Sequence, residues 1–113
     1  GIGSRLDHTL GNLYLLVYAY EKGVDIQMIH PFHKVVLLSK DWRRTIQKED
    51  GSTVSVLPVS RTISGLTMQG FRWDLEKKTI AQGTTWTISN FLQEKQGMIS
   101  VEEGMAFVIQ EKE

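Results

Sequence analysis

The 113-residue sequence contains no cysteine. This absence excludes disulfide bonds, a thiol nucleophile, cysteine-based zinc sites and thiolate-bound iron–sulfur clusters. It does not identify a compartment, because proteins without cysteine occur in reducing and oxidising environments alike. Localisation therefore stays undetermined by the sequence.

Long apolar runs are also missing. The richest stretch, residues 10–20, is about half the length that crosses a bilayer, and Glu21 and Lys22 follow it directly. No basic leader precedes this stretch, and no small-residue cleavage site follows it. We therefore expect no membrane span and no signal peptide in these residues.

Neither charge sign is in excess, since 13 basic residues balance 13 acidic ones. With 41% hydrophobic residues and only two prolines, the composition is that of an ordinary folded protein. A chain of this length forms one sizeable core. We expect a single compact domain over residues 5–113, and we set residues 1–4 aside as a tag scar or a cut terminus.

The stretch 10–20 predicts a helix over about residues 8–22. Asp7 is the expected N-cap, and Gly23 stands where a helix end requires positive φ. Apolar residues occupy nearly every direction around this helix, including the tyrosines, which we expect at the rim of the core. The helix therefore either fills the hollow of a bent sheet or leaves a strip for another chain.

Strand patterns follow the helix at intervals of 8 to 12 residues, separated by turns that contain Gly or Asp. Asp50-Gly51 predicts the tip of one hairpin, and residues 74–77 predict the tip of another. Pro58 indicates an edge strand or a turn, and Pro31 breaks the first strand pattern. The expected strands cover residues 24–28, 32–38, 45–47, 53–56, 66–73, 78–81 and 104–110, with a strand or short helix over 85–92.

One helix followed by strands is typical of the α+β class. The expected architecture is an N-terminal helix packed on a strongly bent, mainly antiparallel sheet or small barrel of about five to seven strands.

Motifs with a defined chemistry are absent. No glycine elbow surrounds a serine, and no glycine-rich run precedes Lys-Ser or Lys-Thr. His30 and His33 are the only histidines close in sequence, and they are weak candidates for a metal site because a third ligand is not evident. The simpler interpretation is that they flank a turn proline, so the sequence predicts no cofactor, no metal and no catalytic residue.

Cations and aromatic residues alternate at two places in a basic central region. Residues 34–78 hold nine basic and five acidic side chains, a surplus of four. Side chains of this kind stack on bases while neutralising phosphates, or form hot spots between proteins. The simpler interpretation places the tryptophans in the core or at its rim. The candidate surface consists of Trp42, Arg43, Arg44, Arg72, Trp73 and Lys77.

These observations favour a non-enzymatic protein-interaction or assembly domain, excised from a larger protein, with a protein partner or a second copy as its ligand. Binding of single-stranded nucleic acid to the aromatic and basic surface is the first alternative. A small metal- or ligand-dependent enzyme around His30 and His33 is the second.

Overall fold

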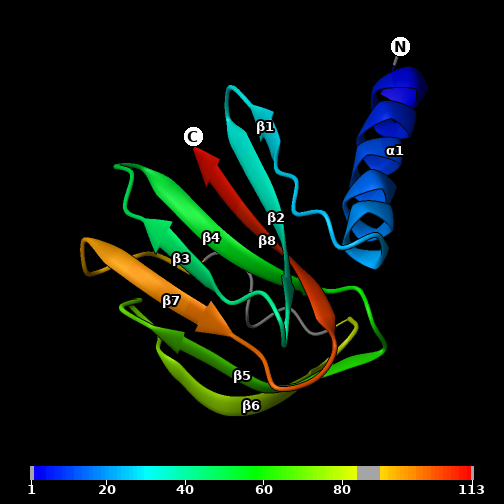
Figure 1. The fold of residues 1–113 in the computed structure, drawn as a ribbon. Coiled ribbons are helices and arrows are strands. Elements are labelled where there is room, and N and C mark those ends of the chain that lie inside the picture. Colours follow the sequence, from blue (N-terminus) through cyan, green and yellow to red (C-terminus); the bar gives the residue numbers. More distant parts are fainter. Residues whose placement is uncertain (1, 84–89, 113) are drawn as a thin grey trace.

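The computed structural model describes residues 2–83 and 90–112, which form one helix and eight strands (Figure 1). Helix α1 (Ile2–Glu21) comes first. The strands are β1 (Met28–His30), β2 (His33–Ser39), β3 (Arg44–Gln47), β4 (Ser52–Pro58), β5 (Thr62–Gln69), β6 (Leu75–Ala81), β7 (Gln96–Ser100) and β8 (Met105–Lys112).

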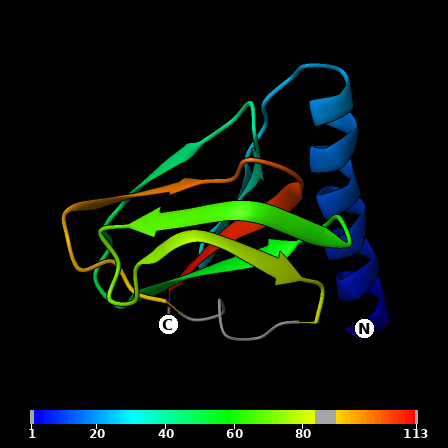
Figure 2. The same cartoon turned by 90° about the horizontal axis from the view of Figure 1, so that it is seen from below.

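The strands form two four-stranded antiparallel sheets that pack face to face (Figures 1 and 2). One sheet has the order β1-β2-β8-β4, and the other has the order β3-β7-β5-β6. A single cluster of buried side chains from both sheets, including Leu38, Val56, Leu66 and Ile99, fills the space between them. The α+β class and the antiparallel pairing are confirmed, whereas the single bent sheet or barrel of five to seven strands is wrong.

The predicted hairpin at Asp50-Gly51 is also wrong. Gly51 turns the chain with φ +75°, but β3 pairs with β7 and β4 pairs with β8. The turn therefore passes the chain from one sheet to the other, which local turn chemistry does not reveal. The pairing of the second predicted hairpin is confirmed, because β5 pairs with β6. Its turn covers residues 70–74 and not the predicted 74–77, which belong mostly to β6.

Strand β2 matches the apolar run predicted for residues 32–38. The alternate residues Val35 and Leu37 are buried outside the central cluster, on the face opposite Leu38. A continuous apolar run is typical of a strand covered on both faces. Here the core covers one face, and α1 contacts β1 and β2 on the outer side.

Helix α1 begins at Ile2, so Asp7 lies inside the helix and is not its N-cap. The predicted end is confirmed. Gly23 has φ +77°, and Val24 N–H donates to Ala19 O at 2.8 Å, which satisfies a carbonyl of the last turn.

Several large apolar side chains are exposed in residues 10–21, the part of α1 whose side chains the structure describes. Leu16 and Ala19 are buried, but Tyr14 and Tyr18 are 72% and 59% exposed, so the expectation that these tyrosines belong to the core rim is wrong. The helix stands at one side of the sandwich and is not wrapped by a sheet (Figure 2). Within residues 2–83 and 90–112, no helix has both the length and the hydropathy required to span a bilayer.

The remaining expectations differ in detail. Residues 24–27 are not a strand, and β1 begins only at Met28. Pro31 and Phe32 form the turn between β1 and β2, since His30 pairs with His33. The element expected at 85–92 falls largely outside the described residues.

Candidate functional site

The structure divides the predicted aromatic and basic surface into separate places. Arg44, the first residue of β3, pairs with Ile99 of β7, which also pairs with Met68 of β5. Trp42 comes two residues before Arg44 and therefore lies at the end of the sheet where β3 begins. The chain leaves β5 beyond Gln69 at the opposite end, where Trp73 follows. Trp42 and Trp73 therefore do not share one surface.

Trp42 belongs to the joint between α1 and the sandwich. The ring of Tyr20 meets its indole edge-on at 4.8 Å, and the Arg44 guanidinium lies 5.4 Å from the indole. Arg44 also donates to both carboxylate oxygens of Asp25 at 2.7 Å, which lowers the Asp25 pKa, and to Leu37 O at 2.6 Å. Trp42 and Arg44 are thus engaged in holding the helix.

Two further predicted cations, Arg43 and Lys77, are exposed. Arg43 Nη1 lies 3.6 Å from Met98 Sδ. Lys77, in β6, has Nζ 3.9 Å from a carboxylate oxygen of Glu102 and adopts φ +48°, which is unusual for a residue other than glycine. Neither lies in the joint around Trp42.

His30 and His33 flank the turn between β1 and β2, with their Nδ1 atoms 3.5 Å apart. His33 Nε2 lies 3.7 Å from Glu111 Oε1. In the described part of the chain, no three His, Cys, Asp or Glu side chains are placed to hold a metal ion together.

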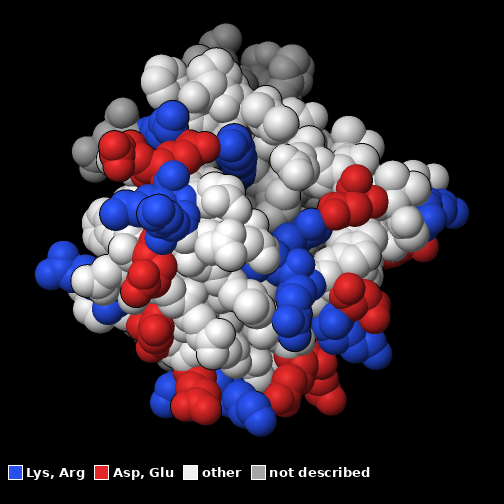
Figure 3. All heavy atoms as spheres, turned by 60° about the vertical axis from the view of Figure 1, so that its left-hand side comes forward, with Lys and Arg blue, Asp and Glu red and all other residues white. Residues whose placement is uncertain are grey.

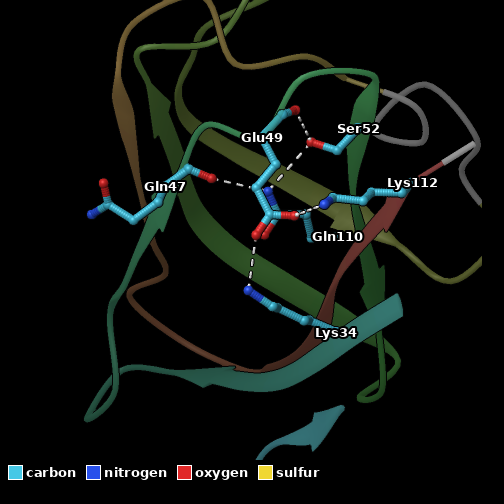
Figure 4. Close-up of polar contacts among 6 residues, drawn as sticks. All are labelled: Lys34, Gln47, Glu49, Ser52, Gln110 and Lys112. Carbon is cyan, nitrogen blue, oxygen red and sulfur yellow. Dashed lines mark hydrogen bonds and ion pairs between the residues drawn. The ribbon is translucent and has the colours of Figure 1, made fainter. Parts of the chain in front are cut away.

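Two adjoining hollows, of about 330 and 500 Å³, open between β2, β8 and the segment that follows β3. They share Lys34, Glu49 and Gln110 (Figure 4). The face turned forward in Figure 3 carries Lys and Arg side chains with Asp and Glu side chains beside them.

Glu49 is the central carboxylate of this region. Its Oε1 accepts a hydrogen bond from Lys34 Nζ at 2.9 Å, and its Oε2 lies 3.5 Å from Lys112 Nζ. The Lys34 hydrogen bond lowers the Glu49 pKa. Gln110 beneath it donates to Gln47 O at 3.0 Å (Figure 4). The polar groups of the hollow therefore bind one another, and they join β2, β8 and the β3–β4 connection.

A second region presents aromatic rings to solvent. Trp73 and Phe91 are 54% and 40% exposed, and their ring centroids lie 6.1 Å apart. The Arg72 guanidinium lies 5.0 Å from the Trp73 ring. Arg72 and Phe91 also line an adjacent hollow of about 210 Å³, together with Lys48, Leu92 and Gln93. We call Arg72, Trp73 and Phe91 the aromatic surface.

Buried neighbours hold the aromatic surface in place. Phe71 and Leu92 form a β-bridge and are both buried beneath it. Asp74 Oδ1 accepts from Phe71 N–H at 2.8 Å, which closes the turn after β5. Asn90, only 5% exposed, forms hydrogen bonds to the main chain of Trp73 and Phe91. Sequence reasoning identified Trp73 and Arg72 but missed Asn90, because nothing in the local pattern shows where this side chain points.

Comparison with known proteins gives one consistent result. The family model described as thiamin pyrophosphokinase, vitamin B1 binding domain, matches residues 43–106. The thiamine pyrophosphokinase of Bacillus subtilis is 30% identical over 107 residues, which cover 95% of this chain and 50% of that protein. Thiamine pyrophosphokinase 1 of rice, Oryza sativa subsp. japonica, is 24% identical over 111 residues, covering 96% and 41%.

A solved structure agrees with these relatives. The crystal structure of thiamine pyrophosphokinase from Bacillus subtilis superposes with a TM-score of 0.87 at 28% identity, covering 96% of this chain and 51% of that one. The chain thus spans about half the length of the curated relatives that it matches, or less.

These matches overturn the predicted function. The sequence favoured a non-enzymatic protein-interaction or assembly domain, with nucleic-acid binding as the first alternative and a small metal- or ligand-dependent enzyme around His30 and His33 as the second. The matching family and relatives are thiamine pyrophosphokinases, which are enzymes. The prediction failed because it depended on the absence of catalytic motifs, and a substrate-binding domain need not carry them.

Proposed function

This chain belongs to the thiamin pyrophosphokinase vitamin B1 binding domain family, and we propose that it forms the thiamine-binding part of a thiamine pyrophosphokinase. The observation that carries the proposal is the family match over residues 43–106, which include β3 to β7 and the start of β8. The Bacillus subtilis relative, named thiamine pyrophosphokinase, supports it.

Within the matched residues, we assign thiamine to the aromatic surface. Thiamine carries an aminopyrimidine ring and a positively charged thiazolium ring, and exposed aromatic faces attract both planar and cationic groups. Trp73 and Phe91 are the largest exposed aromatic side chains in the described part of residues 43–106. Trp73 lies on the β5–β6 turn and Phe91 on the segment before β7. Buried neighbours hold both segments in place, so little ordering is required on binding.

The relatives' name denotes the transfer of a pyrophosphoryl group to thiamine, and Arg72 is suited to bind the phosphate oxygens of that group. A guanidinium group binds phosphate oxygens through paired hydrogen bonds. Arg72 lies beside Trp73 and lines the adjacent hollow with Lys48. We therefore propose that these two cations face the phosphorylated end of the product.

Calorimetric titration of the chain with thiamine tests this assignment. Trp73→Ala removes the central ring, and we expect thiamine affinity to fall about tenfold or more, from the loss of stacking and cation–π attraction. Phe32→Ala is the matched control, because Phe32 is 56% exposed and lies outside the matched residues.

The control variant is expected to bind thiamine like the unmodified chain. Absence of thiamine binding by the unmodified chain would overturn the proposed function. Equal affinities of the unmodified chain and Trp73→Ala would overturn the assignment to the aromatic surface.

A further inference from the structure

Asn90 joins the two exposed rings of the aromatic surface through one side-chain amide. Its Nδ2 donates to Trp73 O at 2.9 Å, and its Oδ1 accepts from Trp73 N–H at 3.3 Å. The same Oδ1 accepts from Phe91 N–H at 2.9 Å. The amide thus pairs with Trp73 as a neighbouring strand would, and it fixes Phe91 with the same oxygen.

The main chain of Asn90 is hydrogen-bonded to β4, in the sheet β1-β2-β8-β4. Val54 N–H donates to Asn90 O at 2.7 Å, and Asn90 N–H donates to Val54 O at 2.9 Å. Val54 belongs to β4 and is 1% exposed. Trp73, in contrast, lies on the connection between β5 and β6 of the second sheet. Asn90 therefore ties the turn that carries Trp73 to a strand in the core of the first sheet.

We infer that Asn90 is a positioning residue for thiamine, which sets the separation and tilt of Trp73 and Phe91 before the ligand arrives. The inference rests on the proposed function. Asn90 is 5% exposed and its amide is occupied by main-chain groups, so it acts through the two rings and not by contact with the ligand. Rings that are ordered in advance spare the ligand the entropic cost of ordering them.

The geometry requires a donor and an acceptor on one short side chain. Aspartate has the same shape but, when ionised, only accepts hydrogen bonds. In Asn90→Asp, a carboxylate oxygen would face Trp73 O at the position of Nδ2, which repels the turn. The aromatic rings themselves stay in the sequence, so the variant separates their position from their presence.

Gln110→Glu is the matched control. Gln110 is also a buried amide, 8% exposed, whose Nε2 donates to a main-chain carbonyl, that of Gln47. The change removes the same donor and adds the same charge, but in the hollow around Glu49. General loss of stability therefore affects both variants, whereas loss of ring position affects only Asn90→Asp.

The experiment compares thiamine affinity by calorimetry at a temperature where circular dichroism shows each variant folded. Tryptophan indole N–H resonances are recorded alongside. We expect Asn90→Asp to bind thiamine about tenfold more weakly, because the rings of Trp73 and Phe91 would become ordered only when the ligand binds. We also expect it to shift the Trp73 indole resonance and leave that of Trp42 in place. Gln110→Glu is expected to keep the thiamine affinity and both resonances.

Two results would overturn the inference and leave the proposed function standing. In the first, Asn90→Asp binds thiamine as well as the unmodified chain does, whereas Trp73→Ala binds it more weakly. In the second, Gln110→Glu loses as much thiamine affinity as Asn90→Asp. Failure of the unmodified chain to bind thiamine would instead remove the proposed function itself. If Asn90→Asp does not fold, Asn90→Ser, which has a smaller side chain and no added charge, replaces it under the same criteria.

Discussion

Arg44 and Asp25 form a two-pronged ion pair, with Nη1 and Nη2 each 2.7 Å from a carboxylate oxygen. The pair joins the segment after α1 to the first residue of β3. The Arg44 side chain is 12% exposed, so water competes weakly for its hydrogen bonds. This pair, with Trp42 and Tyr20, fixes the helix end to the sandwich.

Arg44→Lys is expected to destabilise the chain by about 1 to 2 kcal/mol, because an ammonium group cannot make the paired hydrogen bonds of a guanidinium. Urea unfolding measures the loss. In the Asp25→Asn background, the same change is expected to cost clearly less. Equal costs in the two backgrounds would show that the ion pair contributes nothing.

Stability is expected to fall in acid because of Asp25 and Glu49. Hydrogen bonds from Arg44 and Lys34, respectively, hold the pKa of each carboxyl below its ordinary value in the folded chain. The unfolded chain then binds more protons, so this part of the stability is present above the ordinary pKa values of about 4. It is lost as pH falls through the lower, folded values.

Urea midpoints measured between about pH 7 and about pH 3 test this dependence. The double variant Asp25→Asn, Glu49→Gln is expected to be less stable at neutral pH and to lose less stability on acidification. An acid dependence as steep as that of the unmodified chain would mean that other groups cause it.

The sequence predicted class and local strand positions better than it predicted connections. The apolar run in β2 and the Gly23 helix end depend on neighbouring residues, and both were predictable. The passage at Asp50-Gly51 between sheets was not, because strand pairing depends on distant residues such as those of β8 and β7.

The candidate site shows the same limit. Alternation of Arg and Trp suggested one surface from two similar motifs, yet Trp42 is packed against Tyr20 and Trp73 is exposed. Exposure depends on which element covers each residue, and neither motif contains that information. Asn90 gained its role only from the turn that folds onto it.

Two adjacent leucines of α1 test how the helix packs. Leu16 is 2% exposed and Leu15 is 54% exposed. Leu16→Ala is expected to cost about 2 to 4 kcal/mol, and Leu15→Ala less than about 1 kcal/mol, because only the first change removes a buried side chain. Similar costs in urea unfolding would contradict this orientation of α1.

Alanine substitutions at two glycines with positive φ distinguish the stability cost of backbone strain from that of steric crowding. Gly51 has φ +75° with no atom within 4 Å of an added Cβ. At Gly104, with φ +97°, the added Cβ would lie 2.7 Å from Thr62 O. We expect Gly51→Ala to cost about 1 kcal/mol from strain alone, and Gly104→Ala at least about 1 kcal/mol more. Equal losses of stability would show that the chain around Gly104 adjusts freely.

The most direct test of thiamine binding at the aromatic surface is a set of nuclear Overhauser effects between thiamine ring protons and the chain at saturating ligand. We expect intermolecular effects to the indole protons of Trp73 and the ring protons of Phe91. Effects confined to other side chains, such as those of Trp42 or Phe32, would contradict it.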